Sequence, residues 1–159
     1  MFGLFKSAPF ADPQLGGLKR SRGMWRGTIR LDAGASVPLV LSGGRAAPDA
    51  EALRIARAVP PEYASWRATI ARELFDHYTP YAQAAAAGEI DAHASAPPLI
   101  DEPSAVWPHT SLQFVQVAPL SGVLVVEIGY RVEWDEEHTL GARFRDGKLL
   151  ELCGSVLAP

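Results

Sequence analysis

Hydrophobic and polar residues alternate along both ends of the chain, whereas the middle has a different spacing. From residue 25 to 31 apolar positions alternate with Arg26, Thr28 and Arg30, and a second alternating stretch covers residues 37 to 41. A period of two is typical of a half-buried strand. Pro38 cannot donate a hydrogen bond to a neighbouring strand, so we expect it at a strand start or at a sheet edge.

The middle of the chain predicts two helices. Pro48-Asp49 suits a helix start, and an alanine-rich helix is expected over residues 50–58. A second helix is predicted by apolar residues three or four apart, namely Tyr63, Trp66, Ile70, Leu74, His77, Tyr78 and Tyr81. Pro60-Pro61 should separate the two helices, because each ring removes a donor and clashes with the preceding turn. A loop should follow over residues 88–98, and Pro103 to Trp107 suits one helical turn.

The last third of the chain predicts strands. Residues 112–117 form one candidate strand, and residues 124–134 alternate without interruption. A closing hairpin is expected from His138 to about residue 156. A loop with Gly147 in the left-handed conformation, followed by a bulge, would place Ala142 opposite Leu150 and gather the leucines on one face.

These elements predict an α+β fold with a single domain at residues 15–159, preceded by a loosely ordered leader at residues 1–14. The layer rule favours an antiparallel sheet of about six to seven strands with two main helices on one face. Strands of a parallel sheet would instead be apolar throughout. Trp25, Trp66 and Trp134 are in phase with apolar faces, so we expect them in the core.

Composition excludes several classes of function. The 159 residues are 48% hydrophobic and 21% charged, as in an ordinary soluble domain. A net charge of -3 gives no field that would gather nucleic acid. No apolar run reaches the ~18 residues of a membrane span. The one cysteine, Cys153, cannot form an intramolecular disulfide, which fits a reducing, cytoplasmic location.

The segment Trp134-Asp135-Glu136-Glu137-His138 concentrates the polar chemistry of the chain. Its carboxylates and imidazole could serve as metal ligands or as an acid–base pair. Consecutive side chains at a strand end diverge, however, so three ligands rarely converge there. We therefore predict no catalytic residue, no metal and no cofactor. His138 is expected to be a structural connector to a carboxylate or carbonyl, with Asp135 and Glu137 organising the turn.

The arrangement of motifs resembles a family of bacterial domains of uncharacterised function. The matching features are Leu15-Gly16-x-Leu18, Trp25-x-Gly27-x-Ile29, the stretch Trp134-Asp135-x-Glu137-His138-x-Leu140-Gly141, and a closing Gly147-Lys148 hairpin. Some members of that family belong to polymorphic toxin–immunity loci. The resemblance implies a single small domain and an immunity role, and it assigns no catalytic residues.

Three functions are compatible with these observations. The first is a non-catalytic binding or immunity-type protein, with Trp134 to His138 as the binding surface and a basic protein surface as the partner. The second is a hydrolase that uses Asp135, Glu137 and His138. The third is a small-ligand binder with an aromatic-lined pocket. We favour the first, because no motif for a catalytic mechanism is complete.

Overall fold

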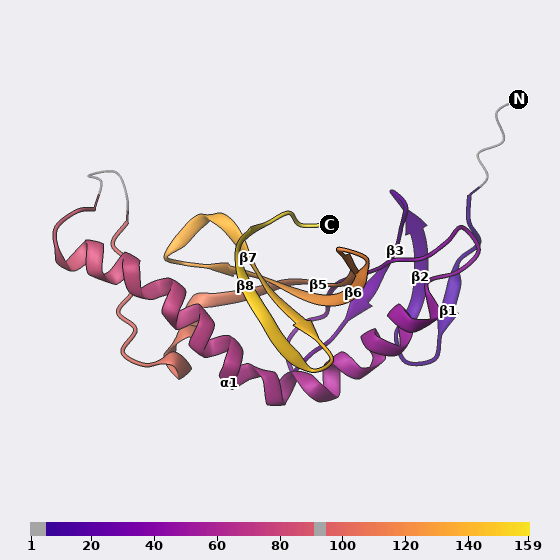
Figure 1. Cartoon of the computed structure of the whole chain (residues 1–159), viewed down its shortest axis with the longest axis horizontal. Helices are drawn as coiled ribbons and strands as arrows, with labels where there is room; N and C mark the ends of the chain where they lie inside the picture. The colour runs from indigo at the N-terminus through magenta and orange to yellow at the C-terminus, as the bar shows by residue number, and fades with distance from the viewer. Residues whose placement is uncertain (1–5, 91–94) are drawn as a thin grey trace, which may run out of the picture.

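The computed structural model describes residues 6–90 and 95–159, in which eight strands form one sheet beside a long helix (Figure 1). The strands are β1 (Phe10–Asp12), β2 (Gly16–Ser21), β3 (Met24–Ile29), β4 (Val37–Leu41), β5 (Thr110–Leu120), β6 (Val123–Val132), β7 (Asp135–Arg145) and β8 (Lys148–Val156). They lie across the sheet in chain order. The helices of this part of the chain are α1 (Ala50–Ala86) and the 3-10 helix η1 (Pro103–His109). The α+β class is confirmed.

The sheet differs from the prediction in strand number and in direction. It has eight strands rather than six or seven, and it is mixed, because β4 and β5 are parallel while the other neighbours are antiparallel. The helix α1 lies between β4 and β5 in the chain and returns it to the same end of the sheet, which makes a parallel pair possible. Pro38 lies at the start of β4, one residue before pairing with β5 begins at Leu39.

The two strands that the prediction lacked lie at the N-terminus. Residues 10–12, within the expected leader, form β1, and Asp12 is only 4% exposed. Asp12 accepts hydrogen bonds from the backbone N–H groups of Gln14 and Leu15 and from the guanidinium of Arg57 on α1. These bonds tie the β1–β2 turn to the helix. The short strands escape a periodicity search because few residues alternate in each.

The two predicted helical segments form one helix of 37 residues, so the predicted break at Pro60-Pro61 is wrong. The buried positions continue in phase across both prolines, with Val59 on one side and Tyr63 on the other. Burying this stripe outweighs the cost of about 3 kcal/mol that an interior proline imposes. The helix is bent rather than straight in Figure 1, as expected where prolines remove donors. Neither α1 nor η1 has an apolar stretch that could span a membrane.

The closing hairpin has a different register from the predicted one. Asp146 and Gly147 both have positive φ, 51° and 72°, and they form a two-residue turn between Arg145 and Lys148. A bulge follows, so Ala142 lies opposite Leu152 rather than Leu150. The predicted bulge directly after Gly147 is wrong, because the pairs Arg145–Lys148 and Phe144–Leu149 separate the turn from the bulge. Both registers place Ala142 and Leu152 on the same face.

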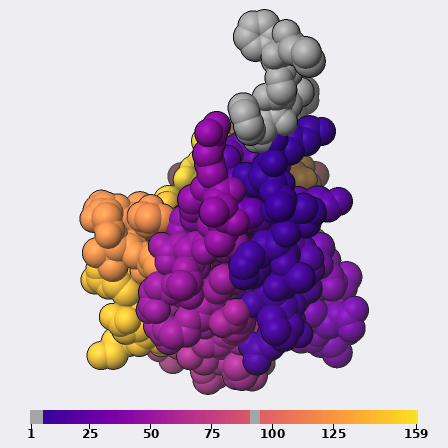
Figure 2. Space-filling view, turned by 90° about the vertical axis from the view of Figure 1, so that its right-hand side faces the viewer, coloured from indigo at the N-terminus to yellow at the C-terminus, as the bar shows by residue number. Residues whose placement is uncertain are grey.

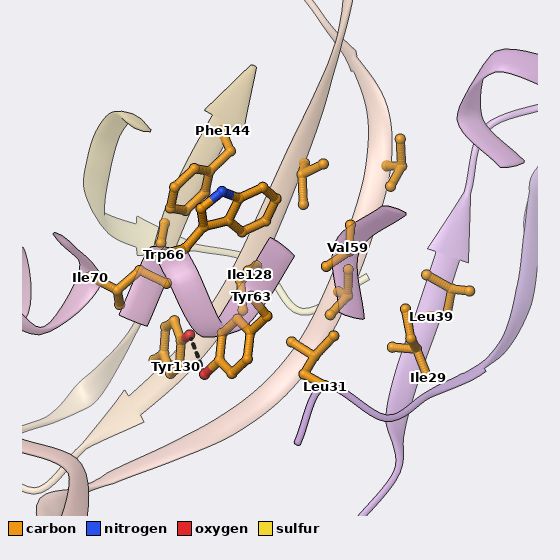
Figure 3. Packing of buried hydrophobic residues seen from close by; sticks show 14 of the residues in the cluster. Ile29, Leu31, Leu39, Val59, Tyr63, Trp66, Ile70, Ile128, Tyr130 and Phe144 are labelled. Atoms are coloured by element: carbon orange, nitrogen blue, oxygen red, sulfur yellow. Dashed lines mark hydrogen bonds between the residues drawn. The ribbon is translucent and has the colours of Figure 1, made fainter. Parts of the chain in front are cut away.

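The core lies between α1 and one face of the sheet (Figure 3). Trp66 of α1 stacks on Phe144 of β7, with ring centroids 4.2 Å apart. The hydroxyls of Tyr63 and Tyr130 share a buried hydrogen bond of 2.9 Å. Trp25, Trp66 and Trp134 are 0%, 7% and 5% exposed, which confirms that they belong to the core.

Candidate functional site

The predicted site lies where β6 passes into β7, and the backbone there divides its side chains into two groups. Trp134 and Asp135 are buried, whereas Glu136, Glu137 and His138 are exposed. The division follows from the strand geometry, because β7 begins at Asp135 and the side chain of Asp135 points toward α1. The buried pair can therefore anchor the turn, while the exposed residues face solvent.

Three side chains surround the carboxylate of Asp135. The hydroxyl of Tyr81 donates to Oδ2 at 2.9 Å, and Nδ1 of His138 lies 2.9 Å from Oδ1 and 3.1 Å from Oδ2. Nε2 of His77 lies 3.9 Å from Oδ2. Because His77 and Tyr81 belong to one face of α1, they hold the start of β7 against the helix.

Trp134 extends this network. Its indole Nε1 donates to Nδ1 of His77 at 3.0 Å. An indole nitrogen can only donate, so Nδ1 of His77 must be unprotonated, and the neutral ring carries its proton on Nε2, facing Asp135. The ring of Trp134 also meets Tyr78 edge to face, with centroids 5.4 Å apart. We call Trp134, Asp135, His138, His77 and Tyr81 the anchor network.

Burial and hydrogen bonding shift the pKa values in the anchor network. Burial acts to raise the pKa of Asp135, but hydrogen bonds from His138 and Tyr81 outweigh it, so this pKa lies below its usual value. Burial lowers the pKa of His77 despite the nearby carboxylate. Burial and the bond to Asp135 raise the pKa of Tyr81 to about 12. At neutral pH the network therefore holds an ionised Asp135 beside a neutral His77 and a neutral Tyr81.

An open groove of about 640 Å³ borders the exposed side of the same turn. Its lining includes Glu133 and Glu136 from the turn, Arg131 from β6 and His109 from the end of η1. Nδ1 of His109 lies 2.6 Å from Glu133 Oε2, and Arg131 donates to the backbone carbonyl of Glu136 at 3.4 Å. The groove is polar and open to solvent, so it forms a surface rather than an enclosed chamber.

Comparison with known proteins identifies the family. The profile of a family described as a domain of unknown function, DUF6985, matches residues 15–156. The chain belongs to the DUF6985 family. A search of curated proteins gave no match, and a search of solved structures gave none either.

The DUF6985 domain brings together only part of the predicted site. Asp135 and His138 share a hydrogen bond, as the connector role for His138 requires. Glu136 and Glu137 lie on the surface, and neither side chain forms an ion pair or hydrogen bond with another residue of the described part of the chain. Among residues 6–90 and 95–159, no three His, Cys, Asp or Glu side chains converge as metal ligands. His93 lies outside the described residues.

Two members of the anchor network were not predicted as site residues. The sequence predicts His77 and Tyr81 only as part of the apolar stripe of the second helix. The spacing of four between them, with polar atoms at the tips of both rings, was the available signal. The sequence could not show which strand end these tips would meet, because Tyr81 and Asp135 are 54 positions apart.

Proposed function

We propose that this DUF6985 domain is a non-catalytic, cytoplasmic binding protein of bacteria that recognises a protein partner with a basic surface. The observation that carries the proposal is the division at the β6–β7 turn. Asp135 is buried and bonded to Tyr81 of α1, whereas the neighbouring Glu136 and Glu137 are exposed. The turn therefore presents carboxylates on an anchored backbone.

An anchored acidic turn suits recognition of a basic partner for two reasons. A surface that is already ordered loses less conformational freedom when the partner binds. Exposed carboxylates carry negative charge, and they accelerate association with a positively charged surface. Glu133 adds a third carboxylate beside the groove, although His109 lies within 2.6 Å of it. The motifs shared with domains from toxin–immunity loci favour a toxin as the partner, and the domain would then act by covering a basic surface of that toxin.

Co-expression with the proteins encoded beside this gene tests the proposal. The variant Glu136→Gln/Glu137→Gln removes two charges from the turn, and Glu73→Gln/Glu89→Gln removes two charges elsewhere as a matched control. We expect one neighbouring protein to be toxic alone, and to be neutralised and co-purified by the parent and the control. The turn variant should lose both properties. Equal protection by all three forms would contradict the role of the turn, and the absence of any complex would contradict the immunity role.

A hydrolase is the second candidate, and one observation favours it. Asp135 binds Nδ1 of His138, whose side chain is half-exposed, and a carboxylate on Nδ1 is the arrangement of the carboxylate–histidine pairs of hydrolases. In those enzymes Nε2 contacts a nucleophile or a water molecule. The hydrogen bonds of the described residues place no hydroxyl or thiol on Nε2 of His138, and the thiol of Cys153 donates to the carbonyl of Ser155 at 3.4 Å. A hydrolytic activity that His138→Gln abolishes without unfolding would establish this alternative.

A further inference from the structure

A second concave surface lies at the opposite end of β6 and β7 from the acidic turn. It is a crevice of about 220 Å³ between α1 and the tips of the β5–β6 and β7–β8 hairpins. In Figure 2 the orange β5–β6 hairpin and the yellow β7–β8 hairpin lie beside the purple surface of α1. The crevice is smaller and more enclosed than the groove at the acidic turn, so it suits a single inserted side chain.

The floor of the crevice is apolar. Ile55 and Trp66 line it from α1, and Leu124 and Phe144 line it from the strands. The rings of Trp66 and Phe144 are nearly parallel, with an angle of 13° between them, and the two residues are 7% and 2% exposed. Figure 3 shows the two rings stacked beside other buried residues of the core. An inserted methylene chain would therefore meet a preformed apolar surface.

The rim of the crevice carries charged groups of both signs, with one carboxylate in excess. It carries three carboxylates and two guanidinium groups, and one of these guanidinium groups, that of Arg54, is already bound by Glu51 at 2.8 Å. Glu62 and Asp146 have no side-chain hydrogen bond or ion pair with another residue of segments 6–90 and 95–159. A side-chain oxygen of Glu62 lies 3.7 Å from the position of a Cβ on Gly147, so this carboxylate overlies the turn that contains Asp146. Two exposed carboxylates thus line the crevice above its apolar floor.

We propose that this crevice receives an arginine side chain of the basic protein partner. The inference rests on the proposed function. It adds to the acidic turn a second contact with the same partner, through an arginine side chain. The methylene stem of arginine would lie on Ile55 and the Trp66–Phe144 stack. Its guanidinium would donate to Glu62 and Asp146, since a planar fork of five donors can serve two carboxylates at once. The other charged group of the rim, Arg145, leaves one carboxylate in excess and so favours a cation over an anion.

Titration with a short peptide tests the inference directly. The probe is an acetylated and amidated Gly-Leu-Arg-Leu-Gly peptide, and its control carries citrulline, which has the same shape without the charge. The indole N–H resonance of Trp66 is identified through Trp66→Phe and followed by NMR. We expect the arginine peptide to shift this resonance and to leave that of the buried Trp25 unchanged, while the citrulline peptide shifts neither. Equal shifts from both peptides, or no shift at Trp66, would overturn the inference.

Paired variants separate this inference from the proposed function. Glu62→Gln/Asp146→Asn should weaken binding of the arginine peptide about tenfold or more, and unchanged binding would overturn the inference. Glu136→Gln/Glu137→Gln should leave peptide binding unchanged. Both pairs are exposed, and a thermal melt of each variant checks that it folds. If the toxin complex depends on Glu136 and Glu137 but not on Glu62 and Asp146, the crevice inference fails and the proposed function stands. If the complex depends on Glu62 and Asp146 but not on Glu136 and Glu137, only the role of the acidic turn is overturned.

Discussion

Nε1 of Trp134 donates a hydrogen bond to Nδ1 of His77 across 3.0 Å, which joins the end of the β6–β7 turn to the helix. The two residues are 57 positions apart in the chain. The bond requires a neutral imidazole, because the indole N–H can only donate. It also leaves the other ring nitrogen of His77 facing Asp135, 3.9 Å from Oδ2. One side chain thereby orders both buried residues of the turn.

The stability of the protein should depend on pH through His77. Burial places the pKa of His77 below its unfolded value of 6.5, so the unfolded chain takes up a proton at a higher pH than the folded protein does. The contribution of neutral His77 to the free energy of unfolding is complete above pH 6.5. It is lost as the pH falls from about 6.5 through the lower pKa of the folded protein. His77→Phe should lower the free energy of unfolding by about 1 kcal/mol at pH 7.5, and it should remove this part of the pH dependence.

Urea unfolding of the parent and of His77→Phe at pH 7.5 and pH 5.5 measures the effect. The two proteins differ at position 77 alone, so the difference between their pH dependences isolates the contribution of His77. The same loss of stability between the two pH values in both proteins would show that His77 does not have to be neutral in the fold.

Replacing His138 should destabilise the fold. His138→Ala removes a partner from the buried Asp135, whereas Glu137→Gln changes an exposed side chain. The imidazole is 45% exposed, so we expect a loss of about 1 kcal/mol and a melting temperature lower by roughly 2–4 °C or somewhat more. Glu137→Gln should melt like the parent. Thermal unfolding of the two variants decides the matter, and the connector role is wrong if His138→Ala also melts like the parent.

Acid should destabilise the protein through Asp12. The hydrogen bond from Arg57 outweighs burial and lowers the pKa of Asp12 to about 2, with further bonds from the backbone of Leu15 and Gln14. The contribution of ionised Asp12 to the free energy of unfolding is complete above the unfolded pKa of 3.8. It is lost as the pH falls from there toward 2. Asp12→Asn should lower stability at pH 7 and flatten the acid dependence between about pH 4 and pH 2 in denaturant unfolding. The exposed Asp101→Asn should do neither, and the pairing with Arg57 would be contradicted if both variants behaved alike.

Gly129 is predicted to be intolerant of a side chain. A Cβ at this position would lie 2.2 Å from Cε1 of Phe114, which is itself only 2% exposed. Gly129→Ala should therefore lower the free energy of unfolding by about 1–3 kcal/mol, the usual cost of overpacking. At Gly154 nothing lies within 4 Å of a Cβ, so Gly154→Ala is the matched control. Chemical denaturation of both variants measures the difference. Equal denaturation midpoints for the two variants would contradict the packing of β5 on β6.

Local periodicity predicted most of the sheet but not the edge formed by β1 and β2. The alternation from residue 124 to 134 corresponds to β6, and the alternation near residue 25 corresponds to β3. β1 has only three residues and depends on Asp12, whose partner Arg57 is 45 positions away. The direction of β5 relative to β4 likewise depends on where the long helix returns the chain. Local patterns contain neither kind of information.

The helix and the site also depend on long-range contacts that local sequence patterns do not predict. Proline chemistry predicts a break at Pro60-Pro61, but the apolar stripe on both sides packs on one core, and its burial outweighs the local cost. At the site, the sequence predicted that His138 bonds a carboxylate or a backbone carbonyl, and in the structure the partner is Asp135, three positions away. It did not place His77 and Tyr81 there, since their contact with Asp135 is set by how α1 crosses the sheet.

The central claim is that the anchored acidic turn recognises a basic protein, and the association rate tests it most directly. The rate constant is measured by stopped flow with the partner protein that co-expression identifies, at low and at physiological salt. For the parent and Glu73→Gln/Glu89→Gln it should be high and should fall steeply as salt rises. For Glu136→Gln/Glu137→Gln it should be several-fold lower at low salt and less dependent on salt. Equal rate constants and equal salt dependence for all three proteins would contradict the account.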